Sequence, residues 1–138
     1  EVGSAAAAVP RLVAGEGVAV VAPSAFHTCV ITTATSTVYC WGMKEKGQLN
    51  LPGVATELDR SVNVPPLLPF ALGETTAKAV ALGVGWHTTL VLLADGSVRC
   101  TGHNLHGGCG YNHTTTIGDN TAAAPTITTE GAVLHGVV

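Results

Sequence analysis

The chain has 138 residues, of which 46% are hydrophobic, 11% charged and 4% aromatic. This composition supports a buried core and excludes long-range disorder, because disordered chains are poor in apolar residues and rich in charge. A net charge of −3 excludes a strongly basic nucleic-acid surface. No signal peptide is visible, and no apolar run reaches the roughly 18 residues of a spanning helix, so we expect no membrane insertion. Glu1 is not an initiator Met, which predicts a processed or partial chain.

An internal repeat organises the sequence. When the sequence is shifted by 60 positions, nine of the 33 residues from 18 to 50 match without a gap. The matches that we consider structural are His27 with His87, Cys40 with Cys100, Gly42 with Gly102, and Gly47 with Gly107. Such self-similarity predicts a repeat architecture.

Each unit has the pattern of three short strands followed by an extended stretch that contains Pro. The expected strands are 18–21, 27–32 and 38–41 in the first unit, and 79–82, 88–93 and 98–101 in the second. Asp95-Gly96 predicts a tight turn in which Gly96 takes a positive φ. The Pro-bearing stretches at 63–70 and 123–128 are restricted to sheet edges. No segment keeps a 3.6-residue apolar period, so we expect little helix.

Three or four strands per repeat of this length are typical of a β-propeller blade. We therefore predict an all-β chain that forms a partial ring of about two blades plus flanking strands. Its expected parts are a tail with the end of a preceding blade (1–16), a first repeat (17–76), a second repeat (77–136) and the start of a further repeat (137–138). Two units cannot close a ring, so other chains or the rest of the polypeptide must cover the open faces.

The units resemble repeats of the RCC1 family. Residues 27–32 read His-Thr and an apolar strand, 38–42 read Val-Tyr-Cys-Trp-Gly, and 46–50 read Lys-Gly-Gln-Leu-Asn, in the family's order. The second unit resembles the family through 83–88 and through Asp95-Gly96. This resemblance implies propeller blades that are four-stranded antiparallel sheets.

Departures from the family pattern place the chain among diverged RCC1-like propellers (the RCC1/β-lactamase-inhibitor-protein-II group). Thr35-Ser36 replaces Asp-Gly, Asn50 replaces a final Gly, and Thr101 replaces Trp. We expect the structural residues of the repeat motif to be His27, Trp41, Gly42, Gly47, His87, Gly96, Gly102 and Gly107. The two histidines are expected to bond the turn of their own blade. Trp41 and Trp86 are expected to pack between blades.

The cysteines and a glycosylation triplet favour the secretory route. Cys29 and Cys40 lie at mirrored positions about the first hairpin turn, within disulfide range of one another. Four cysteines allow three pairings, and we prefer the local pairs Cys29–Cys40 and Cys100–Cys109. The alternative is four reduced cysteines in a cytosolic domain. Asn112-His113-Thr114 is an N-glycosylation acceptor, so we expect sugar at Asn112 on an exposed loop.

Catalytic motifs are absent from the sequence. It has no phosphate-binding loop, dinucleotide fingerprint or nucleophile elbow. The candidate ligands His103, His106, Cys109 and His113 are spaced more widely than the paired ligands of usual zinc sites. We therefore expect no enzyme activity, no cofactor and no metal.

The expected function is that of a non-catalytic propeller segment. It would serve as a structural or protein-binding module of a larger extracellular or cell-surface assembly, such as a filament of the algal mastigoneme type. The expected partners are other protein chains or the rest of its own polypeptide, homo-oligomers included, and not nucleic acid. The alternative, suggested by the family resemblance, is a guanine-nucleotide exchange factor for a small GTPase.

Overall fold

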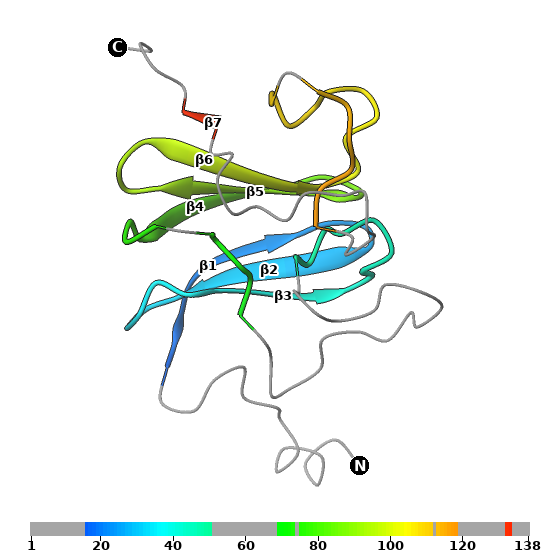
Figure 1. Cartoon of the computed structure of the whole chain (residues 1–138). Helices are drawn as coiled ribbons and strands as arrows, with labels where there is room; N and C mark the ends of the chain where they lie inside the picture. The colour runs from blue at the N-terminus through cyan, green and yellow to red at the C-terminus, as the bar shows by residue number, and fades with distance from the viewer. Residues whose placement is uncertain (1–15, 51–68, 74, 112, 119–131, 134–138) are drawn as a thin grey trace, which may run out of the picture.

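The chain folds into two antiparallel sheets stacked face to face (Figure 1). The computed structural model describes residues 16–50, 69–73, 75–111, 113–118 and 132–133. The first sheet contains β1 (Val18–Pro23), β2 (His27–Thr32) and β3 (Val38–Gly42). The second contains β4 (Ala79–Val84), β5 (Thr88–Leu93), β6 (Ser97–Gly102) and β7 (Ala132–Val133). Within these ranges no helix is long and apolar enough to cross a membrane.

The expected all-β fold with antiparallel units is confirmed. The second sheet has the expected fourth strand, β7, which pairs with β6. In the first sheet the same edge carries a single antiparallel bridge between Tyr39 and Pro69. Residues 63–68 and the second Pro-bearing stretch, 123–128, lie outside the described residues, and β7 begins four residues after that stretch ends.

The second sheet repeats the first with a shift that differs between strands. Both first strands contain a bulge, between Val18 and Val20 in β1 and between Ala79 and Ala81 in β4, which puts them 61 residues apart. Equivalent pairs are Val20↔Ile31 and Ala81↔Leu92 between the first and second strands, and Ile31↔Val38 and Leu92↔Val98 between the second and third. The second strands are therefore also 61 residues apart, whereas the third strands keep the 60-residue shift.

The ungapped 60-residue alignment is thus wrong by one residue in the first two strands. The physical reason is that the turn between β5 and β6 is one residue shorter than the turn between β2 and β3. The structural counterpart of His27 is therefore Thr88, and the counterpart of Phe26 is His87. Matching hydrogen bonds support this register: the Met43 amide donates to the Phe26 carbonyl (2.8 Å), and the His103 amide donates to the His87 carbonyl (2.9 Å).

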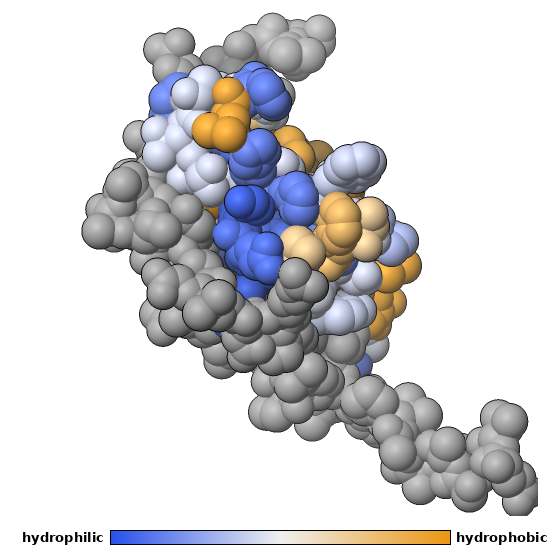
Figure 2. Space-filling model, turned by 90° about the vertical axis from the view of Figure 1, so that its right-hand side faces the viewer, coloured by the Kyte–Doolittle hydropathy of each residue, from blue (hydrophilic) through white to orange (hydrophobic). Residues whose placement is uncertain are grey.

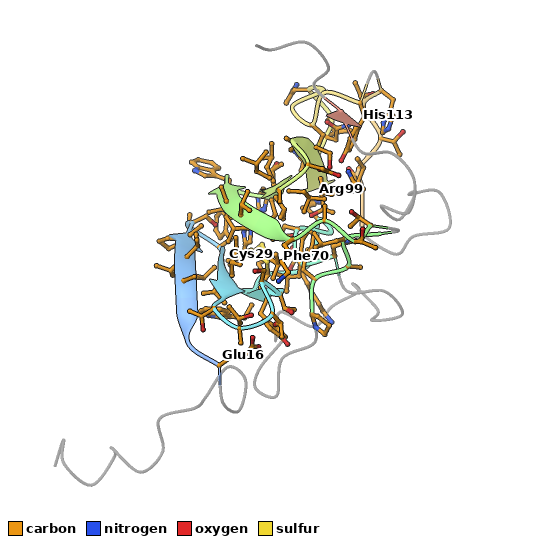
Figure 3. The ribbon with its side chains drawn as sticks, turned by 90° about the vertical axis from the view of Figure 1, so that its left-hand side faces the viewer. Glu16, Cys29, Phe70, Arg99 and His113 are labelled. Carbon is orange, nitrogen blue, oxygen red and sulfur yellow. A yellow bond between two sulfur atoms is a disulfide. The ribbon has the colours of Figure 1, made fainter. Side chains whose placement is uncertain are left out.

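The main core lies between the two sheets. Figure 3 shows Cys29 and Phe70 pointing into this space. Its buried apolar residues are Cys29, Ile31, Val38, Cys40, Leu49, Phe70, Ala79, Val91 and Leu93. They occur at alternate positions of β2, β3 and β5, because successive side chains of a strand point to opposite faces. A smaller cluster of Cys100, Cys109 and Ile117 lies beneath the loop that follows β6.

Glycine is required where each third strand ends. Gly42 and Gly102 have φ values of 113° and 105°, a region that favours glycine. A Cβ at Gly42 would meet the Phe26 carbonyl oxygen, and a Cβ at Gly102 would meet that of His87. The other repeat-motif glycines also have positive φ, namely Gly47 (79°), Gly96 (85°) and Gly107 (69°).

The Gly102→Ala substitution is expected to lower the free energy of unfolding by about 2 kcal/mol or more, since it adds backbone strain and a clash. The matched control is Gly108→Ala, because a Cβ at Gly108 meets no atom within 4 Å. This control should change the free energy of unfolding by less than about 0.5 kcal/mol. Urea unfolding followed by circular dichroism measures both, and equal effects would contradict the close approach.

Candidate functional site

A buried hydrogen-bond network joins the two sheets through Thr89. The Thr89 hydroxyl donates to the Gln48 carbonyl (2.8 Å), and it lies 2.7 Å from Nε2 of His27. A carbonyl can only accept, so the single hydroxyl proton of Thr89 points at Gln48. His27 must therefore carry its proton on Nε2 and donate it to Thr89. The other ring nitrogen, Nδ1, lies 3.0 Å from the Ser24 hydroxyl, in the turn before β2.

The protonation of His27 follows from this environment. Burial, and secondarily the charge on a protonated His87, lowers the pKa of His27 from 6.5 to about 4. The ring is therefore neutral at pH 7, which agrees with one donating and one accepting nitrogen. The sequence placed His27 against the turn of its own blade, whereas its second nitrogen reaches across to the neighbouring sheet. His87 makes a different contact, because it is the counterpart of Phe26.

A row of five contacting rings lies at the end of the sheets that carries the β1–β2 and β4–β5 turns. Phe26 stacks on His87 (ring centroids 4.9 Å apart, planes 2° apart) and meets Trp86 edge to face at 6.2 Å. His87 contacts His103 at 6.4 Å, and His103 contacts His106 at 6.3 Å. We call Trp86, Phe26, His87, His103 and His106 the turn-end strip.

The turn-end strip is accessible to solvent. Trp86 is 73% exposed and Phe26 is 39% exposed, and Leu105 beside His106 is 59% exposed. Figure 2 shows this end of the molecule, where hydrophilic side chains gather between apolar ones. Exposed aromatic groups with polar neighbours are typical of protein interfaces.

The expectation that Trp86 packs between blades is wrong. Trp86 lies in the β4–β5 turn and not in a strand, so its ring projects beyond the sheets, and the described ring contact is with Phe26. Trp41 lies within β3 and is half-buried.

All four cysteines are paired in the structure, as Cys29–Cys40 and Cys100–Cys109. Cys29 lies directly opposite Cys40 between β2 and β3, with their Cα atoms 4.1 Å apart. The Cα atoms of Cys100 and Cys109 are 5.4 Å apart. Tyr111 holds the second pair in place, since its hydroxyl accepts from the Cys100 amide (2.6 Å) and donates to the Cys100 carbonyl (3.3 Å).

The remaining candidate residues form no further centre in the described part of the chain. Asn112 lies outside the described residues. Cys109 is paired with Cys100, which removes it from the candidate ligand set of His103, His106 and His113. Among the described residues no group of three or more His, Cys, Asp or Glu could hold a metal ion.

Sequence reasoning missed Thr89 and the stacking of Phe26 on His87. Both depend on the one-residue difference between the turns, which an ungapped alignment hides. The available signal was Asp95-Gly96: counted back from that turn, Thr88 and not His87 takes the place of the family's His.

Comparisons with known proteins agree with the repeat architecture. Residues 79–107 match the family model described as Regulator of chromosome condensation (RCC1) repeat. No curated protein sequence matches the chain.

Three solved structures are similar to the chain. The crystal structure of human WBSCR16 has a TM-score of 0.63 and 21% identity, and covers 80% of this chain and 25% of that one. The crystal structure of Kap60 bound to yeast RCC1 (Prp20) has a TM-score of 0.52 and 22% identity, with coverages of 62% and 18%. That of Prp20p from Saccharomyces cerevisiae has a TM-score of 0.51 with the same identity and coverages. The chain thus spans a quarter or less of their lengths, and the likeness confirms the propeller-blade fold.

The pairing of the cysteines is testable on native material. Peptide mapping without reduction should recover 29 linked to 40 and 100 linked to 109. Reduction should lower the free energy of unfolding by about 2–4 kcal/mol, because each bridge restricts the unfolded chain. Alkylation of all four thiols without prior reduction would contradict the pairing.

The free energy of unfolding should fall as pH is lowered from 6.5 to 4. In this window the unfolded chain protonates His27 and the folded chain does not, so protons favour unfolding; below about 4 this group causes no further loss. The total effect is at most about 3 kcal/mol. In urea titrations, His27→Gln should flatten the dependence, whereas the exposed-residue control His106→Gln should keep it. An unchanged slope in His27→Gln would refute the assignment.

Proposed function

This chain is built of RCC1-like propeller repeats, and we propose that it is a non-catalytic module that binds protein partners within a larger extracellular or cell-surface assembly. The fold supports a binding role. Solved structures with this fold include yeast RCC1 (Prp20) with Kap60 bound, and Prp20p described with its binding to Gsp1p and histones. Those partners belong to those proteins; what carries over to our proposal is that such propellers present surfaces to other proteins.

The turn-end strip is the observation that carries the proposal. An indole that is 73% exposed, braced at its edge by Phe26, is a rigid apolar anchor. Interface hot spots are enriched in Trp, and they are surrounded by groups that exclude water. Around Trp86 the imidazoles of His87 and His103 offer hydrogen-bonding atoms beside the anchor. This combination of an apolar centre with polar neighbours fits a protein surface as partner.

An extracellular location is supported by the chemistry of the cysteines. Both cysteine pairs are at bonding positions, and disulfides persist in oxidising compartments. The glycosylation triplet that begins at Asn112 is compatible with that route. A filament such as an algal mastigoneme is the narrower assembly that we propose, on the low charge and the Ala-, Thr- and Gly-rich composition. We propose repeat boundaries at 17–76 and 77–136.

The exchange-factor alternative is not favoured. Identities of 21–22% to the solved structures carry the fold and not an activity. The chain covers 18% of the yeast chain, and no contact surface of an exchange factor can be located on it.

The binding role predicts that Trp86 contacts another protein. Trp86 replaced by p-benzoylphenylalanine, in cells that produce the chain, should give a photo-cross-link to a distinct partner protein. The matched control places the same group at Ala94, which is exposed in the β5–β6 turn at the opposite end of β5. Cross-linking at both positions to the same proteins, or at neither, would count against the strip as the binding surface.

Affinity for the cross-linked partner gives the second readout. Trp86→Ala should weaken binding by about 30-fold, since loss of a hot-spot aromatic costs about 2 kcal/mol. The free energy of unfolding should change by less than about 0.5 kcal/mol, because the side chain is exposed. Unchanged affinity would reject the strip as the anchor.

A further inference from the structure

Each sheet has two faces, and the chain itself shows how such faces pack. The forward face is the side that carries Cys29, Ile31 and Val38 in the first sheet. The backward face is the side that carries Val91 and Leu93 in the second sheet. The forward face of the first sheet packs against the backward face of the second, and this contact forms the main core.

The forward face of the second sheet is open at the position where the first sheet is closed. Leu92 is the counterpart of Ile31, because they occupy the same place in the pairing of the second and third strands. Ile31 is 2% exposed, whereas Leu92 is 39% exposed. Their neighbours on the third strands differ in the same way, since Val38 is 1% exposed and Val98 is half-buried. An apolar side chain is therefore left in solvent at the centre of a packing face.

The backward face of the first sheet is open in the same sense. Val18 and Val21 are the counterparts of Ala79 and Leu82. Ala79 is 3% exposed and Leu82 packs against the core, whereas Val18 is 45% exposed and Val21 is 63% exposed. The half-buried Trp41 shares this backward face, since it lies on β3 opposite Thr28, which pairs with Pro23 of β1.

We propose that a second copy of this chain covers these faces, head to tail, with the geometry of the internal contact. The forward face of the second sheet in one copy then packs against the backward face of the first sheet in the next. The two open faces lie on the sides of the sheets that point away from each other (Figure 1), so one copy can bind a neighbour on each side. Contacts of this heterologous kind continue until a ring closes or a filament grows.

A polar contact is expected to repeat along with the apolar one. Thr28 is the counterpart of Thr89, since each pairs with the last residue of its neighbouring first strand. Thr89 donates across the internal contact to the carbonyl of Gln48. Under the 60-residue shift of the loop after the third strand, Gly108 takes the place of Gln48. The Thr28 hydroxyl of one copy would then donate to the Gly108 carbonyl of its neighbour.

This inference rests on the proposed role in a larger assembly, but it uses a different surface. Variants of the sheet faces therefore leave the turn-end strip unchanged. Failure of the head-to-tail contact would not remove partner binding through Trp86, and loss of that binding would not remove the head-to-tail contact.

Mixing two variants tests the contact. Val21→Glu blocks the backward face and Leu92→Glu blocks the forward face, so each variant alone should sediment as a monomer while the unmodified chain associates with rising concentration. An equimolar mixture should form a 1:1 dimer and nothing larger, because one intact face of each kind remains. Each glutamate should weaken association by about 100-fold or more, since an unpaired charge would be buried.

Leu105→Glu is the matched control, because Leu105 is exposed on the loop after β6, away from both sheet faces. It should associate like the unmodified chain. Circular dichroism and urea unfolding check that the variants fold, and Leu92→Ser replaces Leu92→Glu if the latter does not. The proposal is overturned if the unmodified chain stays monomeric, which would leave the faces to another polypeptide. It is also overturned if the mixture of variants stays monomeric, or if either single variant associates normally.

Discussion

The packing of one antiparallel sheet on the next is the interaction on which the rest of this structure depends. A sheet of short strands buries little by itself and needs a second layer to cover its apolar face. Here the second layer is supplied by the repeat, whose Val91 and Leu93 fill the space opposite Ile31 and Val38. Cys29 and Cys40 lie in the same layer, so their link stiffens the hairpin where the two sheets meet.

The polar network in this contact sets the position of one sheet on the other. An apolar layer tolerates sliding, because dispersion and area burial have little direction. Thr89 and His27 add direction, since a buried hydroxyl or imidazole without its partner is costly. The low pKa of His27 is a consequence of the same burial. Packing and hydrogen bonding thus select one arrangement of the sheets.

The exposed turn end follows from this arrangement. Both first hairpin turns leave the sheets at the same end, so stacking the sheets brings Phe26 onto His87 and leaves Trp86 outside. The rings that we assign to binding are thus held by the core beneath them. The same stacking leaves the two outer sheet faces uncovered, which separates an end suited to one kind of partner from sides suited to another repeat.

Much of the architecture was predictable from the sequence. Runs of Val, Leu and Ile broken by turn residues marked six strands within one or two residues, because strand and turn preferences act locally. The period-2 geometry of a hairpin also put Cys29 opposite Cys40, as the structure has them. The family motifs identified the blade. What sequence matching could not supply was the register between repeats, since the identical His-Thr pairs attracted an alignment that the shorter second turn shifts by one residue.

The sequence by itself determined the all-β class, the repeat, the turn positions and the local pairing of Cys29 with Cys40, because each depends on residues close together in the chain. Tertiary structure alone decided that Thr89 bridges the sheets, that His87 takes the place of Phe26, and that Trp86 is exposed. It also decided that Ile31 is buried while its counterpart Leu92 is not. The physical reason is that these properties depend on what lies across the face of a sheet, and an apolar residue in a strand has the same local sequence whether or not a neighbour covers it.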